Sequence, residues 1–281
     1  MRVKISHLVI GTTAWIAGAS TLAYRYMSPA TSEKTSSSTR NPHSHHSHSA
    51  PTHDWREQAK EVTSWRTNEA SAVSAASRQE IFDQGAFSYD NEIGTDELVM
   101  GLLLMRRFLL RNAKGKVLET AAGSGRNIKY YPSKCAVTMI DSSPKMLAIA
   151  AKKVKDLNGD QRKKFCCYTT SNDSTLPFDD RSFDTVVDTF GLCSYEDPVE
   201  GLKEMSRVLK PGGSMLLLEH GRSHYEFLNT ILDNSAYKHA KRWGCWFNRD
   251  MDTIFEEAGL NIRTQYRFHF GTTWYVIVNK E

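Results

Sequence analysis

A carboxylate and a cluster of small residues lie side by side in the segment VLETAAGSGRN, which begins at Val117. Glu119 ends an apolar run, and Ala121, Gly123 and Gly125 follow it closely. A backbone without bulky side chains can pass very near a ligand. A second carboxylate, Asp141, ends the next apolar run. These residue types predict a small-molecule site with close backbone contacts and two negative charges.

The type of ligand follows from the charge of this loop. A glycine-rich turn after a strand could hold the pyrophosphate of a dinucleotide at a helix N-terminus. Glu119 argues against that interpretation, because a carboxylate repels a pyrophosphate and attracts a cationic amine. S-adenosylmethionine (SAM) carries an ammonium and a sulfonium, and Asp141 is placed to accept hydrogen bonds from its ribose hydroxyls. We therefore predict SAM as the cofactor.

Short apolar runs alternate with helical segments after Gly115. The runs predict strands over Lys116–Ala121, Ala136–Asp141, Phe165–Thr169, Thr185–Phe190 and Ser214–Glu219. We expect helices over 143–157 and 198–209, a turn at 211–213, and an antiparallel hairpin around Gly271. This alternation predicts a mostly parallel α/β sheet. Ligands bind such sheets beyond the carboxyl ends of the strands, where the predicted site residues lie.

Four segments occur in the order of a known set of motifs: VLETAAGSGRN, MIDSSPKML, SNDSTLPFDDRSFDTVV and EMSRVLKPGGSMLLLEHG. They resemble class I SAM-dependent methyltransferases, closest to the ubiquinone-biosynthesis and methyltransferase-11 branch, over about residues 80–280. The resemblance implies a Rossmann-like, seven-stranded, mostly parallel sheet with helices on both faces and an antiparallel terminal hairpin. It implies cofactor binding by Glu119, Ala121, Gly123, Gly125, Asp141, Ser142, Asn172, Asp173 and Phe190.

Two departures from this pattern concern the cofactor contacts. Ala121 stands where the first glycine of the loop is usual. Asn172 stands where many relatives carry an acidic residue near adenine, and Asp173 could take its place. These departures bear on the adenine contacts and leave the expected fold unchanged.

The stretch from His220 to Asp250 carries a narrower resemblance. It is similar to the fungal Oms-type mitochondrial inner-membrane methyltransferase-like proteins, and more distantly to the methyltransferase-like seven thiol methyltransferases. This resemblance implies a small or lipophilic methyl acceptor, such as a thiol or a quinone-like phenol. Two alternatives remain open: a catalytically idle assembly factor with the methyltransferase fold, and an RNA methyltransferase.

His220 ends the fifth predicted strand, on the side where an acceptor would bind. Its ordinary pKa is near neutrality, so it could act as a general base or could only position the acceptor. Aromatic residues in the segments that follow are expected either in the core or around an apolar acceptor pocket: Trp243, Trp246, Trp274 and Tyr275.

The first residues have a different character. The stretch from Ile5 to Tyr24 contains no charged residue, and its 20 residues match the length of one membrane span. It could be a membrane anchor, a cleaved secretory signal or a mitochondrial targeting segment. We favour an uncleaved anchor that directs import, which predicts a single-pass protein of the mitochondrial inner membrane. The predicted parts are an anchor (1–27), a disordered Ser/His-rich linker (28–53), lead-in helices (54–112) and a methyltransferase domain (113–281).

Charge and cysteine usage narrow the possible partners. The net charge is +4, and Arg2, Lys4 and Arg25 supply three of these charges before the first acidic residue, which leaves about +1 for the rest. Nucleic-acid enzymes usually carry a stronger basic surface, so a nucleic-acid partner is not favoured. The five cysteines have no C-x-x-C spacing, which predicts buried reduced thiols and no zinc site, with only Cys193 left open.

Overall fold

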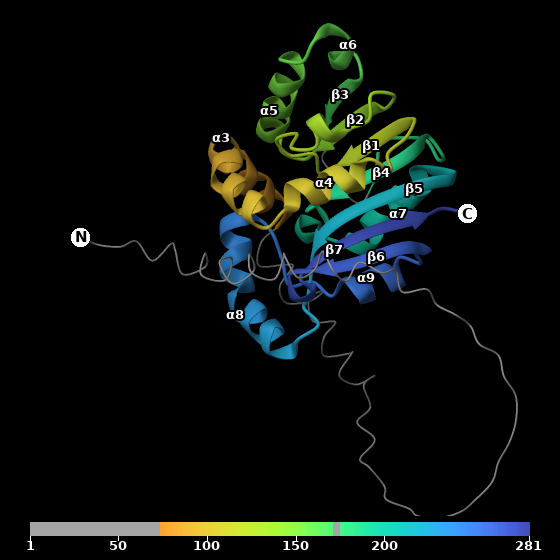
Figure 1. Ribbon diagram of the computed structural model, residues 1–281. Helices are drawn as coiled ribbons and strands as arrows, with labels where there is room; N and C mark the ends of the chain where they lie inside the picture. Colours follow the sequence, from red (N-terminus) through yellow and green to blue (C-terminus); the bar gives the residue numbers. More distant parts are fainter. Residues whose placement is uncertain (1–73, 171–174) are drawn as a thin grey trace, which may run out of the picture.

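The computed structural model describes residues 74–170 and 175–281, in which one sheet carries helices on both faces (Figure 1). The strands are β1 (Lys116–Thr120), β2 (Ala136–Asp141), β3 (Phe165–Thr169), β4 (Phe183–Thr189), β5 (Leu209–His220), β6 (Ile262–Phe268) and β7 (Thr273–Asn279). The α-helices are α3 (Ala75–Val99), α4 (Leu102–Leu110), α5 (Pro144–Lys155), α6 (Gly159–Arg162), α7 (Pro198–Val208), α8 (Glu226–Trp243) and α9 (Met251–Glu257). Short 3-10 helices are η4 (Ile128–Tyr130), η5 (Leu192–Ser194) and η6 (His269–Gly271).

The sheet has the strand order β3-β2-β1-β4-β5-β7-β6. β1 to β5 pair in parallel, whereas β7 runs antiparallel to both β5 and β6. The predicted Rossmann-like sheet is therefore confirmed, and so is the terminal hairpin around Gly271. All carboxyl ends of the parallel strands meet at one edge, near α3 and α8 (Figure 1).

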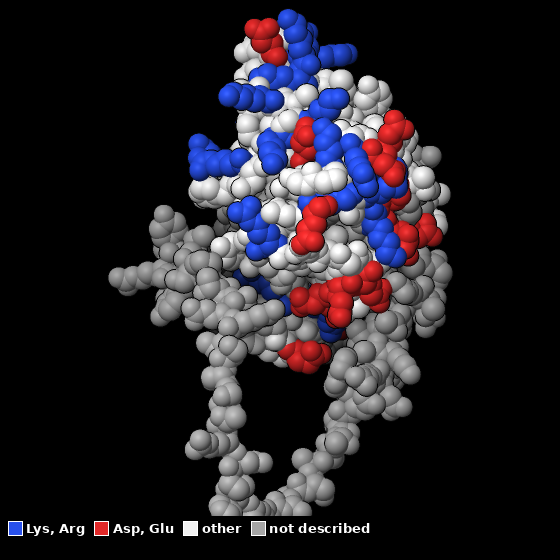
Figure 2. Space-filling view, turned by 90° about the vertical axis from the view of Figure 1, so that its right-hand side faces the viewer, with Lys and Arg blue, Asp and Glu red and all other residues white. Residues whose placement is uncertain are grey.

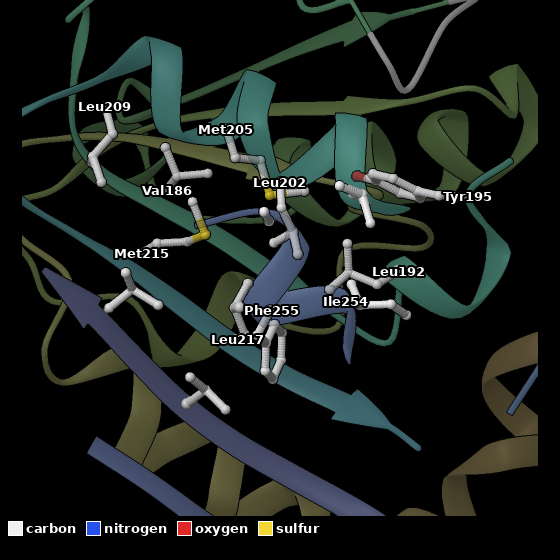
Figure 3. Close-up of a cluster of buried hydrophobic side chains, with 14 of the residues drawn as sticks. Val186, Leu192, Tyr195, Leu202, Met205, Leu209, Met215, Leu217, Ile254 and Phe255 are labelled. Carbon is white, nitrogen blue, oxygen red and sulfur yellow. The ribbon is translucent and has the colours of Figure 1, made fainter. Parts of the chain in front are cut away.

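Both faces of the sheet are covered by apolar helix surfaces. On one face, α7 and α9 pack against β4 and β5 through side chains such as Met205, Leu217 and Phe255 (Figure 3). On the other face, residues of α4 and α5 such as Leu109 and Ala150 pack against the sheet. Strands buried on both faces read as continuous apolar runs, which is why the central strands could be located from the sequence.

The structure corrects two expectations and gives the lead-in region its form. The described part of that region forms two helices, α3 and α4, which are divided at Gly101, where the backbone adopts a left-handed conformation with φ of 69°. β5 already begins at Leu209, so the residues of the expected turn at 211–213 lie within this strand. They form a local irregularity in its pairing with β4, where the register shifts between the pairs Phe183–Leu209 and Thr185–Ser214. Cys166 is exposed because β3 is an edge strand, contrary to the prediction of buried thiols.

Several predicted features lie outside the described residues. They are the anchor (1–27), the linker (28–53), the first part of the lead-in helices, and Asn172 with Asp173. Within 74–170 and 175–281, none of the helices combines the length and the apolarity needed to cross a bilayer. α3 and α4 fall in the last part of the predicted lead-in region, and the division of the chain into domains remains a prediction.

Candidate active site

A cavity of about 600 Å³ lies at the carboxyl ends of the parallel strands. It brings together most of the predicted site residues: Glu119, Ala121, Gly123, Asp141, Ser142, Phe190 and His220. Gly125 lies behind the loop instead, where a Cβ atom would come within 2.5 Å of Ile128 and 3.0 Å of Ala150. Gly125 therefore allows the loop to pack closely on α5, and the cavity is formed by the residues around it.

The loop after β1 is built to leave space for a ligand. Ala121, Gly123 and Gly125 all have positive φ angles, of 44°, 55° and 76°. Ala121 thus keeps the backbone conformation of the glycine that it replaces. A Cβ atom added to Gly123 would meet no heavy atom closer than 4.0 Å, so the space above this residue is open. A ligand in the cavity can approach the backbone here.

Asp141 ends β2 and is 9% exposed. One carboxylate oxygen accepts a hydrogen bond from the amide of Gly123 (2.7 Å), and the other accepts one from the amide of Ser143 (2.8 Å). Ser143 also caps α5 by accepting from the amide of Met146 at 3.1 Å. The carboxylate is held at the cavity wall, and its further lone pairs can accept from ribose hydroxyls.

Glu119 is almost fully buried at the end of β1. Its carboxylate accepts hydrogen bonds from the side-chain amide of Asn127 (2.9 Å) and the hydroxyl of Tyr131 (2.8 Å). Burial raises the pKa of Glu119 to about 7, against the effect of these two hydrogen bonds. A cationic group in the cavity would favour the ionised carboxylate.

Arg106 is a site residue that the sequence analysis missed. It lies on α4 and is 4% exposed. Its guanidinium donates to Glu97 (2.8 Å), Asn127 (3.0 Å) and Thr189 (2.7 Å), which links it through Asn127 to Glu119. The signal was its position: in LLLMRRFLL, a charged residue shares the helix face of Leu102, Leu109 and Leu110. An arginine on a buried face needs acidic or polar partners.

α3 covers the cavity and is fastened to its walls by three carboxylates, Asp83, Asp90 and Glu97. They are spaced seven residues apart, which places them along one face of the helix. Asp83 accepts from the hydroxyl of Ser143 (2.5 Å) and the amide of Lys145 (3.2 Å).

Asp90 and Glu97 bind the loop that follows β1. Asp90 accepts from Ser124 (2.6 Å), Arg126 (3.0 Å) and Lys153 (2.5 Å). Glu97 pairs with Arg126 as well as with Arg106. Although burial opposes ionisation, these cations hold the pKa values of both carboxyls below their ordinary range. We call Asp83, Asp90 and Glu97 the α3 clamp.

His220 and Phe190, from the ends of β5 and β4, form the part of the wall next to the loop after β1. Phe190 has a φ angle of 60°, and its ring lies between the guanidinium of Arg106 (5.1 Å) and the imidazole of His220 (4.4 Å). Burial, with a smaller effect of His239, Arg106 and His269, lowers the pKa of His220 to about 3. The expectation of a pKa near neutrality is therefore not met, and the imidazole is neutral at physiological pH.

The remaining wall is largely aromatic and comes from α3 and α8. Phe82, Tyr89, His239 and Trp243 line it. Burial, and then the charge of Arg242, lower the pKa of His239 to about 4, so this imidazole is also neutral. The other three aromatic residues singled out in the sequence take the alternative role of core residues: Trp246 packs on α8, and Trp274 and Tyr275 pack in the sheet.

Comparison with known proteins agrees with this geometry. Residues 118–217 match a family model described as a methyltransferase domain. The chain is 34% identical over 215 residues to "Methyltransferase OMS1, mitochondrial" of Saccharomyces cerevisiae, a match that covers 71% of this chain and 45% of the yeast protein. The chain therefore spans less than half the length of that relative.

A more distant relative and a solved structure extend the comparison. The chain is 29% identical to "Ubiquinone/menaquinone biosynthesis C-methyltransferase UbiE" of Shewanella sediminis, over 65% of this chain and 74% of that protein. A SAM-dependent methyltransferase of Thermotoga maritima, described as a possible histamine N-methyltransferase, has the same fold with a TM-score of 0.50. That match has 20% identity and covers 72% of this chain and 99% of the solved one. The resemblance predicted from the motifs is confirmed, and the chain carries a methyltransferase domain of the SAM-dependent type.

Proposed function

We propose that the protein is a SAM-dependent methyltransferase that acts on a small or lipophilic acceptor. The observation that carries this proposal is a single cavity in which Glu119 and Asp141 face the same space as the aromatic wall of α3 and α8. The carboxylates of Glu119 and Asp141 suit a positively charged cofactor that contains a ribose. The aromatic wall suits an apolar acceptor.

The residues present fit the amino-acid end of SAM. Glu119 offers a carboxylate to an ammonium group. Arg106 offers a cation to a carboxylate, since its Nε atom is buried and has no hydrogen-bond partner among the described residues. Open space over Gly123 and the carboxylate of Asp141 would receive the ribose. When bound, SAM supplies a methyl group on a sulfonium that is already a good leaving group.

The protein's own contribution is orientation and exclusion of water. The loop after β1 and Phe190 form one side of the cavity, and α3 and α8 close the other side. An acceptor held against the aromatic wall would share the cavity with the cofactor, which brings the two reactants close together. His220 and His239, both neutral, can each accept a hydrogen bond from a thiol or a phenol without a formal charge. This supports a weakly acidic, uncharged acceptor.

The charge on the face drawn in Figure 2 gives no support to a nucleic-acid substrate. Figure 2 shows one side of the molecule, where Lys and Arg are interspersed with Asp and Glu. On this side no uniform basic surface is seen, of the kind that phosphate backbones require. A methylation assay on RNA at low and high salt tests this alternative.

Titration calorimetry with SAM is the primary test of the proposed function. We expect micromolar or tighter binding, followed by transfer of a labelled methyl group from SAM to a small aromatic thiol or phenol. Absence of SAM binding would contradict the proposal. Binding without transfer to any member of a broad acceptor panel would favour the catalytically idle assembly factor.

We further propose that the protein is anchored in the mitochondrial inner membrane by one span within residues 1–27. The uncharged stretch from Ile5 to Tyr24 and the similarity to a mitochondrial yeast protein support this. The full chain should resist extraction from mitochondrial membranes by alkaline carbonate, and a chain that lacks residues 1–27 should be released. Release of the full chain would contradict the anchor and favour a cleaved targeting segment.

A further inference from the structure

Two cysteines that the proposed reaction does not use face each other across the cavity wall. Cys193 lies in η5, directly after β4, and is 2% exposed. Cys245 follows Gly244, which ends α8, and is 8% exposed. Both side chains line the cavity. A small solute that enters the cavity can therefore reach two thiols that the bulk solvent does not.

The backbone holds these cysteines together. The amide of Trp246, the residue after Cys245, donates a hydrogen bond to the carbonyl of Cys193 at 2.9 Å. The carbonyl oxygen of Cys193 lies about 2.4 Å from its own Cα atom, and the amide nitrogen of Trp246 lies about 2.4 Å from the Cα atom of Cys245. The two Cα atoms of the cysteines are therefore within ~8 Å of each other, close to the span of a disulfide. The Sγ atom of Cys193 also lies 3.4 Å from the carbonyl oxygen of Phe190 and 3.7 Å from the hydroxyl of Ser194.

The two thiols are chemically unequal. The hydrogen bond from Cys245 lowers the pKa of the Cys193 thiol; burial opposes this, while Ser194 and the guanidinium of Arg249 favour the thiolate. The same hydrogen bond, together with burial, raises the pKa of Cys245 well above its ordinary value. Of the two cysteines, Cys193 therefore has the thiol with the lower pKa, and a lower pKa favours attack by the thiolate.

We propose that Cys193 and Cys245 form a reversible disulfide inside the cavity, with a peroxide as the oxidant and a dithiol as the reductant. The Cys193 thiolate attacks one peroxide oxygen, the O–O bond breaks, and water leaves after taking up a proton, which gives a sulfenic acid. The Cys245 sulfur then attacks the Cys193 sulfur and releases a second water. Two thiols and one hydrogen peroxide yield one disulfide and two waters. A dithiol reverses the reaction by thiol–disulfide exchange.

The bond would join the loop after β4 to the end of α8. It closes a loop of about fifty residues, which favours the folded state because it restricts the unfolded chain. It also fixes the end of the helix that carries His239 and Trp243. An effect on methyl transfer rests on the proposed function, whereas formation of the disulfide does not.

The test uses the full-length chain with the exposed Cys166 and the half-buried Cys167 replaced by serine, which limits cross-linking between molecules. After treatment with a small excess of hydrogen peroxide, we expect the intact mass to fall by two hydrogen atoms and the free thiol count to fall by two. Peptide mapping should recover Cys193 linked to Cys245, and dithiothreitol should restore both thiols. Cys135 is buried without a neighbouring thiol in the described structure and serves as an internal control that stays reduced.

A second measurement distinguishes the internal bond from other oxidation. The oxidised protein should melt several degrees higher than the reduced protein, and this increase should be absent in Cys193→Ser and in Cys245→Ser. Peptide maps that show oxidised cysteines but no link between Cys193 and Cys245 would overturn the proposal. SAM titration of the reduced protein tests the proposed function separately, so either idea can fail alone.

Discussion

The carboxylate of Asp141 lies 2.7 Å from the amide nitrogen of Gly123 and accepts its hydrogen bond. Two residues predicted to bind the cofactor, from the ends of neighbouring strands, therefore hold each other in place. The loop after β1 is held in place by the protein's own hydrogen bonds. Such preorganisation lowers the entropy that a ligand loses on binding.

Replacing Asp141 with alanine should weaken SAM binding by about 10- to 100-fold, or about 1.5–3 kcal/mol, because charge-assisted hydrogen bonds to ribose and to the Gly123 amide are lost together. Titration calorimetry gives the affinity, and a thermal melt confirms that the variant is folded. Asp160→Ala, an exposed carboxylate on α6, is the matched control and should bind like the parent. Equal affinity of the Asp141 variant and the parent would rule out the ribose contact.

Gly123→Ala should reduce SAM affinity by at least about tenfold, because the added methyl group projects into the open space that the ligand needs. Gly259→Ala is the control: its φ angle of 66° gives a similar backbone strain, and no heavy atom lies within 4 Å of its added Cβ atom. Both variants should lose similar stability in thermal melts, and only the first should lose binding. Parallel loss of binding in both would show that strain, not the cavity, is responsible.

SAM binding should release a proton near neutral pH. Burial raises the pKa of Glu119 to about 7, so much of the carboxyl is protonated at a slightly acidic pH, and a bound ammonium would stabilise the ionised form. Affinity should therefore rise by up to about fivefold between about pH 6 and about pH 7. Calorimetry in two buffers of different ionisation enthalpy measures the released proton directly. Glu119→Gln should bind more weakly and without pH dependence; an identical pH profile in this variant would assign the proton to another group.

At saturating SAM, methyl transfer should show no change in rate around the ordinary pKa of histidine, because the imidazole of His220, with a pKa of about 3, stays neutral above about pH 5. His220→Asn keeps a hydrogen-bonding side chain and should retain turnover within about tenfold of the parent. His220→Ala should lose more, with SAM affinity unchanged. A loss of about 10²–10⁴-fold in the asparagine variant, with a rate inflection near neutrality in the parent, would instead identify a general base.

The strands could be located from the sequence because helices cover both faces of the sheet and the strands are therefore continuous apolar runs. The rule that ligands bind beyond the carboxyl ends of parallel strands then placed Glu119 and Asp141 in one cavity. The contribution of Arg106 could not be predicted, since its partners come from three separate segments. The pKa of His220 could not be predicted either, because it depends on burial in the folded chain and on residues far away in the sequence, such as Arg106 and His239.

The α3 clamp has a consequence for how long a cofactor stays bound. Each of its three carboxylates binds a segment that lines the cavity, so departure of the ligand through this side requires several ion pairs to separate together. Dissociation should then be slow compared with that from an open cleft, and added salt should accelerate it because screening weakens partly exposed ion pairs. Release of the product would in that case limit turnover. The turnover rate would then depend on ionic strength and not on the chemistry of the acceptor.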